Sequence, residues 1–169
     1  PDGKLVARYD KIHLFGFHFS TLDIRQDSRV HNDVFTNLAE ALLANNHPNF
    51  PKNYFDLSEK EQVEILSKVN GTIDFSLISD EETLKTLKTI EAIKTIQQTN
   101  GEAACNRYII SNNQSTLNVM QLFAMLKLAA FQDDMTVDIA PLFETITDLE
   151  NSARVMEELY SNPVYRAHL

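Results

Sequence analysis

Residues 15–31 read FGFHFSTLDIRQDSRVH, an apolar and aromatic run that ends in a cluster of charged side chains. The run has the bulky character of a buried β-strand over about residues 15–25. Its alternation places Asp23 and Arg25 on one face of that strand. A helical pattern follows at once, over residues 29–45. A buried strand that delivers charges to the start of a helix is typical of the active-site edge of an α/β protein.

The same layout of strand, polar exit and helix occurs twice more along the chain. Further strands are predicted over residues 106–111 and 136–143, and further helices over 3–13, 58–69, 80–98, 116–131 and 147–160. Three such units predict a parallel sheet with right-handed crossovers. Because three strands cannot close a barrel that needs eight, the fold class is α/β, either a small open sheet or an incomplete arc of a (β/α)8 TIM-type barrel.

Spacing of cap residues predicts where several helices begin. Capping boxes are expected at Ser58 to Glu61, at Ser79 to Glu82 and at Thr147 to Glu150. Asp27 or Ser28 is the expected cap of the helix after the first strand, and Ser115 of the helix after the second.

Length, net charge and cysteine content limit the class of protein that this sequence can encode. The 169 residues suffice for one domain, and we interpret residues 1–169 as a single partial domain cut from a longer protein, because the chain starts at Pro1 and ends just after a helical pattern. The net charge of −9 argues against a nucleic-acid or anionic-membrane surface. A single cysteine, Cys105, fits a reducing compartment, and the absence of a spanning or signal segment favours a cytoplasmic location.

Polar residues at the three predicted strand exits are expected to meet at one edge of the sheet. They are Asp23, Arg25, Gln26 and Asp27, then Ser111 to Asn113, and then Glu144. The guanidinium of Arg25 suits a phosphate or a carboxylate, which it can hold through two parallel hydrogen bonds. A structural ion pair of Arg25 with Asp23 or Asp27 explains the pattern equally well.

Glu144 is the candidate metal ligand. An apolar approach delivers its carboxylate to the sheet edge, and one carboxylate with waters and substrate oxygens commonly holds Mg²⁺. The alternative is a helix-start carboxylate that the helix dipole favours. The five histidines show no metal-ligand spacing, and the four glycines form no phosphate-binding loop. Cys105 is expected to be an ordinary buried residue.

Three stretches together resemble the phosphoenolpyruvate carboxylase family. Residues 15–31 resemble its motif of the LDIRQ-(D/E)-S type, residues 108–111 (YIIS) resemble its YVIS segment, and residues 137–151 (VDIAPLFETITDLEN) resemble its PLFET-x-x-DL motif. Order and spacing also fit. The resemblance covers nearly the whole chain and is weakest over about residues 46–100. Asn112-Asn113 departs from the family's usual Met-Ala, so no function is assigned there.

The resemblance implies an internal portion of a (β/α)8 barrel in an enzyme of the carboxy-lyase kind. Phosphoenolpyruvate and bicarbonate would give oxaloacetate and phosphate with Mg²⁺ or Mn²⁺, a reaction that replenishes the tricarboxylic acid cycle. By the match, Arg25 falls on the family's arginine that binds the substrate phosphate, and Glu144 on one of its two metal-ligand carboxylates. Because members of the family usually form tetramers, the resemblance implies a homotetramer of full-length chains. In it, this segment would contact the remainder of its own chain.

Three functional motifs of the family do not occur in these residues. The TAHPT motif with the catalytic histidine, the GYSDS motif with the second metal carboxylate, and the Gly- and Arg-rich mobile loop are all missing from the sequence. We therefore place no catalytic residue within this segment and expect the isolated chain to be inactive. The rival interpretations are a non-catalytic module that binds phosphate or carboxylate, and an interaction domain whose charged groups are all ion-paired.

Overall fold

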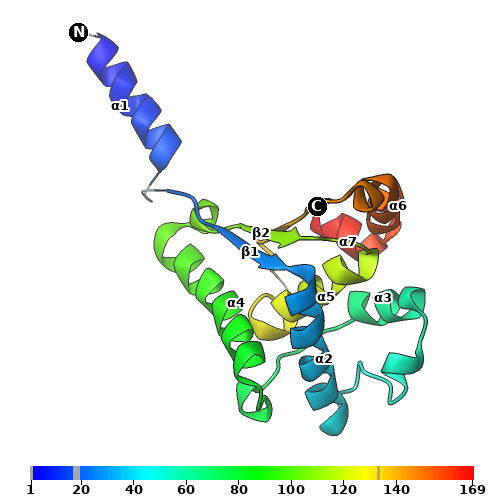
Figure 1. Ribbon diagram of the computed structural model, residues 1–169. Coiled ribbons are helices and arrows are strands. Elements are labelled where there is room, and N and C mark those ends of the chain that lie inside the picture. The colour runs from blue at the N-terminus through cyan, green and yellow to red at the C-terminus, as the bar shows by residue number, and fades with distance from the viewer. Residues whose placement is uncertain (1, 17–19, 133) are drawn as a thin grey trace.

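Three parallel strands form an open sheet at the centre of the computed structural model, which describes residues 2–16, 20–132 and 134–169. The strands are β1 (Asp23–Asp27), β2 (Arg107–Ser111) and β3 (Asp138–Pro141), paired in the order β1-β2-β3 (Figure 1). Asp23 pairs in register with Arg107, and Arg107 with Asp138. The predicted parallel α/β arrangement is confirmed.

Helices make up most of the remaining described chain. They are α1 (Asp2–Phe15), α2 (Ser28–Ala44), α3 (Glu59–Ser67), α4 (Glu81–Asn100), α5 (Thr116–Ala129), α6 (Ile146–Ser161) and α7 (Pro163–His168), with short 3₁₀ turns η1 (Tyr54–Asp56), η2 (Phe75–Leu77) and η3 (Glu102–Ala104). Across the described residues, no helix combines the length and the apolar character that a membrane span requires.

The first strand is shorter than the sequence predicts and lies further along the chain. Phe15 closes α1 instead of opening a strand, and β1 begins only at Asp23. Gly16 explains where the helix stops, because it adopts a left-handed φ of 55° while its N–H donates to Ile12 O at 2.8 Å. Residues 17–19 of the predicted strand lie outside the described residues. The expectation of a strand over 15–25 is therefore wrong at both described ends.

Cap residues confirm three of the predicted helix starts and correct two. Ser58 and Glu61 form the predicted capping box, Asp27 caps α2, and Ser115 caps α5. The box predicted at Ser79 is wrong, because Asp80 is the cap of α4 and its side chain accepts from the N–H of Thr83. The box predicted at Thr147 is wrong, because Thr145 is the cap of α6. Its side chain accepts from the N–H of Asp148, whose carboxylate accepts from the N–H of Thr145. Each threonine is followed three residues later by an acidic residue, so the sequence spacing alone does not distinguish the two caps.

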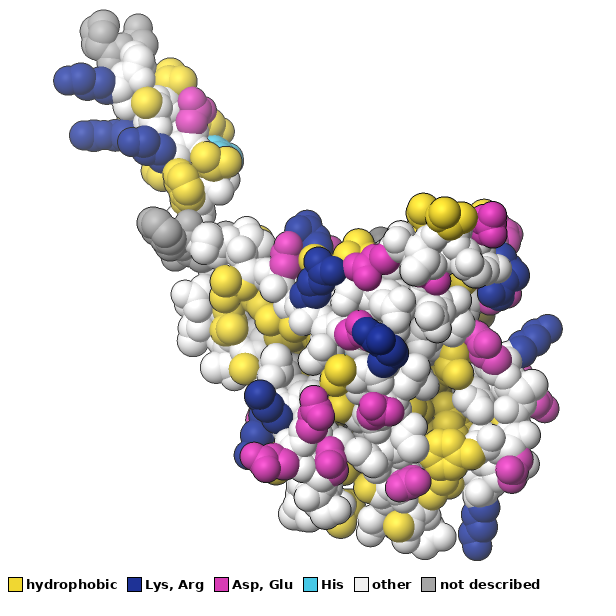
Figure 2. Space-filling model, in the orientation of Figure 1, with side chains coloured by type: hydrophobic (Ala, Val, Ile, Leu, Met, Phe, Trp, Pro, Cys, Tyr) yellow, Lys and Arg dark blue, Asp and Glu magenta, His cyan; other side chains and the backbone are white. Residues whose placement is uncertain are grey.

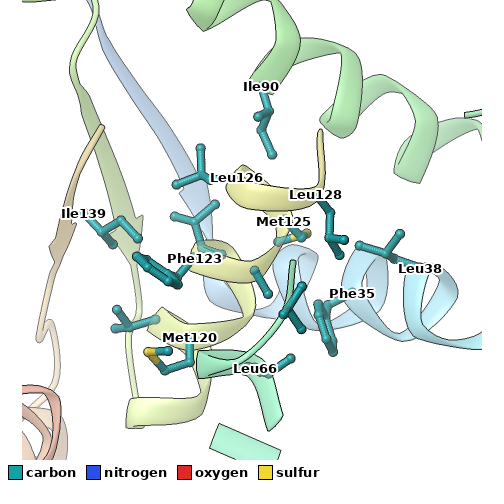
Figure 3. Packing of buried hydrophobic residues seen from close by; sticks show 14 of the residues in the cluster. Phe35, Leu38, Leu66, Ile90, Met120, Phe123, Met125, Leu126, Leu128 and Ile139 are labelled. Atoms are coloured by element: carbon teal, nitrogen blue, oxygen red, sulfur yellow. The ribbon is translucent and has the colours of Figure 1, made fainter. Parts of the chain in front are cut away.

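The hydrophobic core is organised around α5, which is apolar on nearly all sides. Figure 3 shows α5 residues such as Met120 and Leu126 among side chains from α2, α3, α4 and β3. Most of α5 is buried, including Val119, Leu122 and Met125, all at 0% exposure. A helix that is apolar all round needs neighbours on every side, and α2, α3, α4 and α6 supply them.

The two faces of the sheet have different surroundings. Tyr108, Ile110 and Ile139 point into the core on the helix-covered face. The opposite face carries exposed charges, and Asp23, Arg107 and Asp138 lie side by side across the three strands at their amino ends. Figure 2 shows acidic and basic side chains next to one another on the part of the surface above the strands. The open face is therefore polar rather than a second apolar core.

Candidate functional site

The carboxyl ends of the three strands come together at one edge of the sheet, as the sequence predicts. The N–H of Asn113 donates to Leu142 O at 2.9 Å and so joins the exit of β2 to that of β3. Ser28 donates from Oγ to Asn112 O at 2.6 Å and joins the start of α2 to the exit of β2. Asn112 adopts a left-handed φ of 54°, a conformation that asparagine tolerates better than most residues. These bonds hold the three exits in one surface.

Arg25 and Glu144 meet across this edge. Arg25 Nη2 donates to Glu144 Oε1 at 2.9 Å, although the two residues are 119 positions apart in the sequence. Their side chains are 58% and 40% exposed, so both remain accessible to a ligand from solvent. A guanidinium and a carboxylate at one accessible edge can bind an oxyanion and a cation, respectively, once they separate.

The neighbouring acids are engaged elsewhere, which corrects one sequence expectation. Asp23 opens β1 rather than ending it, and its carboxylate accepts from Arg107 at 3.3 Å at the amino ends of the strands. The predicted meeting of Asp23 with Glu144 at the carboxyl edge is therefore wrong. The alternative in which Arg25 pairs with Asp23 or Asp27 is also wrong, because Glu144 is its partner.

Asp27 is the cap of α2 and belongs to the edge only as a structural group. Its Oδ1 accepts from the N–H of Arg29 at 2.9 Å, and its Oδ2 accepts from Arg29 Nη2 at 2.8 Å. The hydrogen bonds from the Arg29 side chain, followed by that from its backbone, lower the pKa of Asp27 to about 2. Gln26 turns its side chain to its own strand end, where Oε1 accepts from the N–H of Asp27.

A buried polar layer lies beneath the edge, and sequence reasoning did not assign it. His31 and Tyr108, 0% and 2% exposed, share a hydrogen bond of 3.1 Å between Nε2 and the phenol oxygen. Burial lowers the pKa of His31 to about 4, so the ring is neutral near pH 7. Asn113 is fully buried, and neither Oδ1 nor Nδ2 of its side chain has a hydrogen-bond partner among the described residues. In the sequence, the one indication of this buried polar layer is that the residues next to Tyr108 are apolar.

Glu144 fits a metal as one ligand of a larger set. Among the described residues, no group of three or more His, Cys, Asp or Glu side chains is placed to hold a metal ion. A single accessible carboxylate is nevertheless a common protein contribution to a Mg²⁺ site that keeps its waters. The chemistry of Glu144 therefore fits the predicted role, provided that other ligands come from outside these residues.

The cysteine and the other histidines of the described residues take no part in the Arg25–Glu144 pair. Cys105 is a free, fully buried thiol, as predicted, and burial raises its pKa. His13 is exposed on α1, and His47 and His168 lie in other parts of the fold, away from the Arg25–Glu144 pair. His18 lies outside the described residues.

The fold and the site define a helix-rich α/β protein whose parallel strands present an Arg–Glu pair at their carboxyl edge. A family model described as phosphoenolpyruvate carboxylase matches residues 1–169. The chain therefore belongs to the phosphoenolpyruvate carboxylase family, and the resemblance seen in its motifs is confirmed.

Curated relatives agree with this membership. The chain is 37% identical to a phosphoenolpyruvate carboxylase of Nitrosomonas europaea over 90% of its length, and that match spans 17% of the relative. It is 32% identical to the enzymes so named from Gloeobacter violaceus and Synechococcus, over 98% and 96% of the chain and 18% and 15% of those relatives. The chain thus spans less than a fifth of the length of these relatives.

Proposed function

We propose that this chain supplies one arc of a (β/α)8 barrel to a phosphoenolpyruvate carboxylase, which forms oxaloacetate and phosphate from phosphoenolpyruvate and bicarbonate. The observation that carries the proposal is the meeting of Arg25 and Glu144 at the carboxyl edge of a parallel sheet, 2.9 Å apart. Active sites of parallel barrels lie at that end of the strands. The open sheet supports the barrel, because β1 and β3 are its outer strands and each leaves an edge to extend.

Arg25 is the proposed binding group for the substrate phosphate. Its fixed charge and planar donors match a phosphate in geometry, and its side chain is accessible from the open face. Because the positive charge remains in place as charge moves between phosphate and enolate oxygens, Arg25 stabilises the developing anion without rearrangement.

Glu144 is the proposed ligand for Mg²⁺ or Mn²⁺. When bound, the divalent ion acts as a Lewis acid on the substrate oxygens. Glu144 contributes one negative oxygen donor, and a second carboxylate has to come from another part of the enzyme. Occupation of the site requires Glu144 to exchange Arg25 for the cation. That exchange costs little, because an exposed ion pair stabilises a protein by only about 0–1 kcal/mol.

The rival function is a non-catalytic module that binds a phosphate or carboxylate, or that only mediates interactions. The Arg25–Glu144 ion pair supports this rival function, because an arginine in an ion pair can have a structural role without any ligand. In the leading proposal, the segment works with the remainder of its own chain in a cytoplasmic homotetramer, and no catalytic residue belongs to it.

A hybrid enzyme tests the proposal directly. The matching segment of the Nitrosomonas europaea enzyme is replaced by this chain, and oxaloacetate formation is measured with Mg²⁺ present. The hybrid should be active, and Arg25→Gln and Glu144→Gln should each lower the rate by about 100-fold or more. Arg107→Gln is the matched control, because Arg107 lies on the same sheet face but at the amino ends of the strands.

The outcomes separate the two functions. A hybrid in which Arg25→Gln keeps the rate of the parent hybrid would exclude Arg25 from substrate binding. The isolated 169-residue chain should form no oxaloacetate from phosphoenolpyruvate, bicarbonate and Mg²⁺, and measurable product would contradict the proposed division of the active site. Calorimetry of the isolated chain with phosphoenolpyruvate tests the binding module, which requires heat that disappears in Arg25→Gln.

A further inference from the structure

A buried hydroxyl joins β1 and β2 at the point where both strands end. Ser28 is the first residue of α2 and is 2% exposed. Its Oγ donates to Asn112 O at 2.6 Å, across 84 positions of sequence. The register of the two strands ends at the pair Asp27 and Ser111, which directly precede Ser28 and Asn112. The bond from Ser28 therefore takes the place of the next rung of the sheet.

The residue that accepts this bond is the turn at the end of β2. Asn112 has a left-handed φ of 54°, far from the negative φ of an extended strand. The next residue, Asn113, donates from its N–H to Leu142 O at 2.9 Å, and the N–H of Leu142 donates to Ile110 O at 2.8 Å. The path of the chain after β3 therefore depends on where the turn at Asn112 is held.

Glu144 lies on that path, beyond the paired part of β3. The register between β2 and β3 ends at the pair Ile110 and Pro141, three residues before Glu144. Backbone hydrogen bonds at Leu142 and at Thr145 flank it, the first to β2 and the second within the cap of α6. Because Glu144 is outside the ladder, its place depends on these loop contacts rather than on the sheet.

Arg25, in contrast, is fixed by the sheet itself. It pairs with Ile109 inside the β1–β2 register. The 2.9 Å bond between Arg25 Nη2 and Glu144 Oε1 thus joins a residue inside the ladder to one outside it. The separation of the two groups is set by the loop, and a displacement of about 1 Å in an active site can lower a rate by about 100-fold.

We propose that Ser28 is a positioning residue that sets the separation of Arg25 and Glu144. It acts through the turn after β2 and, being buried, does not itself reach substrate or metal. The inference rests on the proposed function, because that function requires a defined distance between a phosphate-binding and a metal-binding group. A second link, from Asn118 Nδ2 to Asn32 Oδ1 at 3.1 Å, keeps α5 and α2 together when the hydroxyl is removed.

The hybrid enzyme that carries this chain in the Nitrosomonas europaea framework tests this role. Ser28→Ala should lower kcat/KM for phosphoenolpyruvate by about tenfold or more, and should weaken Mn²⁺ binding, measured by electron paramagnetic resonance, by a similar factor. Ser67→Ala is the matched control and should leave both quantities unchanged. Ser67 is also buried, at 7%, and donates to a backbone carbonyl, Val63 O at 2.8 Å, but it lies on α3. Thermal unfolding checks that both variants fold.

A double-mutant cycle separates positioning from a general loss of structure. In a Glu144→Gln hybrid the group that Ser28 positions is already gone, so adding Ser28→Ala should lower kcat/KM by less than about threefold. Independent effects multiply instead, and a loss of about tenfold in that background refutes the proposal.

The outcomes also distinguish this inference from the proposed function. If Glu144→Gln is impaired while Ser28→Ala matches Ser67→Ala in rate and in Mn²⁺ affinity, the positioning role is overturned and the proposed function stands. If Glu144→Gln keeps the rate of the parent hybrid, the proposed function fails, and the positioning role fails with it.

Discussion

Acidification from about pH 8 to about pH 5 should remove about 2 kcal/mol from the free energy of unfolding through His31 alone. The reason is the environment of the ring. His31 is 0% exposed, and burial lowers its pKa from 6.5 to about 4, with Asp27 opposing the shift. The folded state therefore holds the neutral ring, and the unfolded state accepts a proton more readily.

The sign and the window follow from these two pKa values. Above pH 6.5 both states are neutral at this site and the contribution of His31 is fully present. As the pH falls below 6.5, the unfolded state gains a proton first, so stability is lost progressively until the folded ring titrates near pH 4. Each pKa unit between the states is worth about 1.4 kcal/mol, which gives about 2 kcal/mol at pH 5. Asp27, with a pKa of about 2, loses its contribution only below this window.

Urea unfolding of the wild-type chain and of His31→Gln at both pH values measures the effect. The quantity of interest is the change in unfolding free energy with pH, and the difference between the two proteins isolates His31. The pKa values of His47 and His168 are lowered as well, but their contributions are common to both proteins and cancel. His13→Gln, which alters an exposed histidine on α1, is the matched control and should follow the wild type.

Tyr108→Phe separates the two physical causes at this site. It removes the hydrogen bond to His31 but keeps the ring buried, so the pH dependence should survive if burial is the main cause. A pH dependence that is equal in the wild type and in His31→Gln, within about 0.5 kcal/mol, would refute the assignment of a buried neutral ring.

Two further substitutions test the packing and the buried polar layer, again by urea unfolding. Leu126→Ala should cost about 2–5 kcal/mol, because Leu126 is 0% exposed at the centre of the core, and a loss under about 1 kcal/mol would contradict that packing. Asn113→Ala should cost less than about 1 kcal/mol or stabilise the protein, because Oδ1 and Nδ2 of the Asn113 side chain are buried without a partner among the described residues. Asn162→Ala is the comparison and should cost more stability, because Asn162 caps α7 and donates a hydrogen bond to Ser67. Equal losses in the two variants would show that the Asn113 side chain has a partner.

Local sequence patterns were sufficient for the existence and order of the three strands and of helices α1 to α6, but they missed the short helix α7 after Asn162. Apolar runs at Ile109 and Ile139 predicted two strands, and the polar residues after them predicted the helix starts, because these signals act within a few residues. The same patterns indicated that the strands are parallel, since long helical connections join them. Motifs around Arg25 and Glu144 were enough to identify the family, which the family model then confirmed.

Tertiary structure decided the start of the first strand and the partner of each charge. The left-handed turn at Gly16 ends α1 after Phe15, and pairing with Arg107 places Asp23 at the far end of β1. An aromatic run cannot distinguish a helix end from a strand, because both states accept it locally. Likewise, the sequence could not show that Arg25 bonds Glu144, 119 positions away, rather than a nearby aspartate. Only the register of three parallel strands brings those two side chains to the same edge.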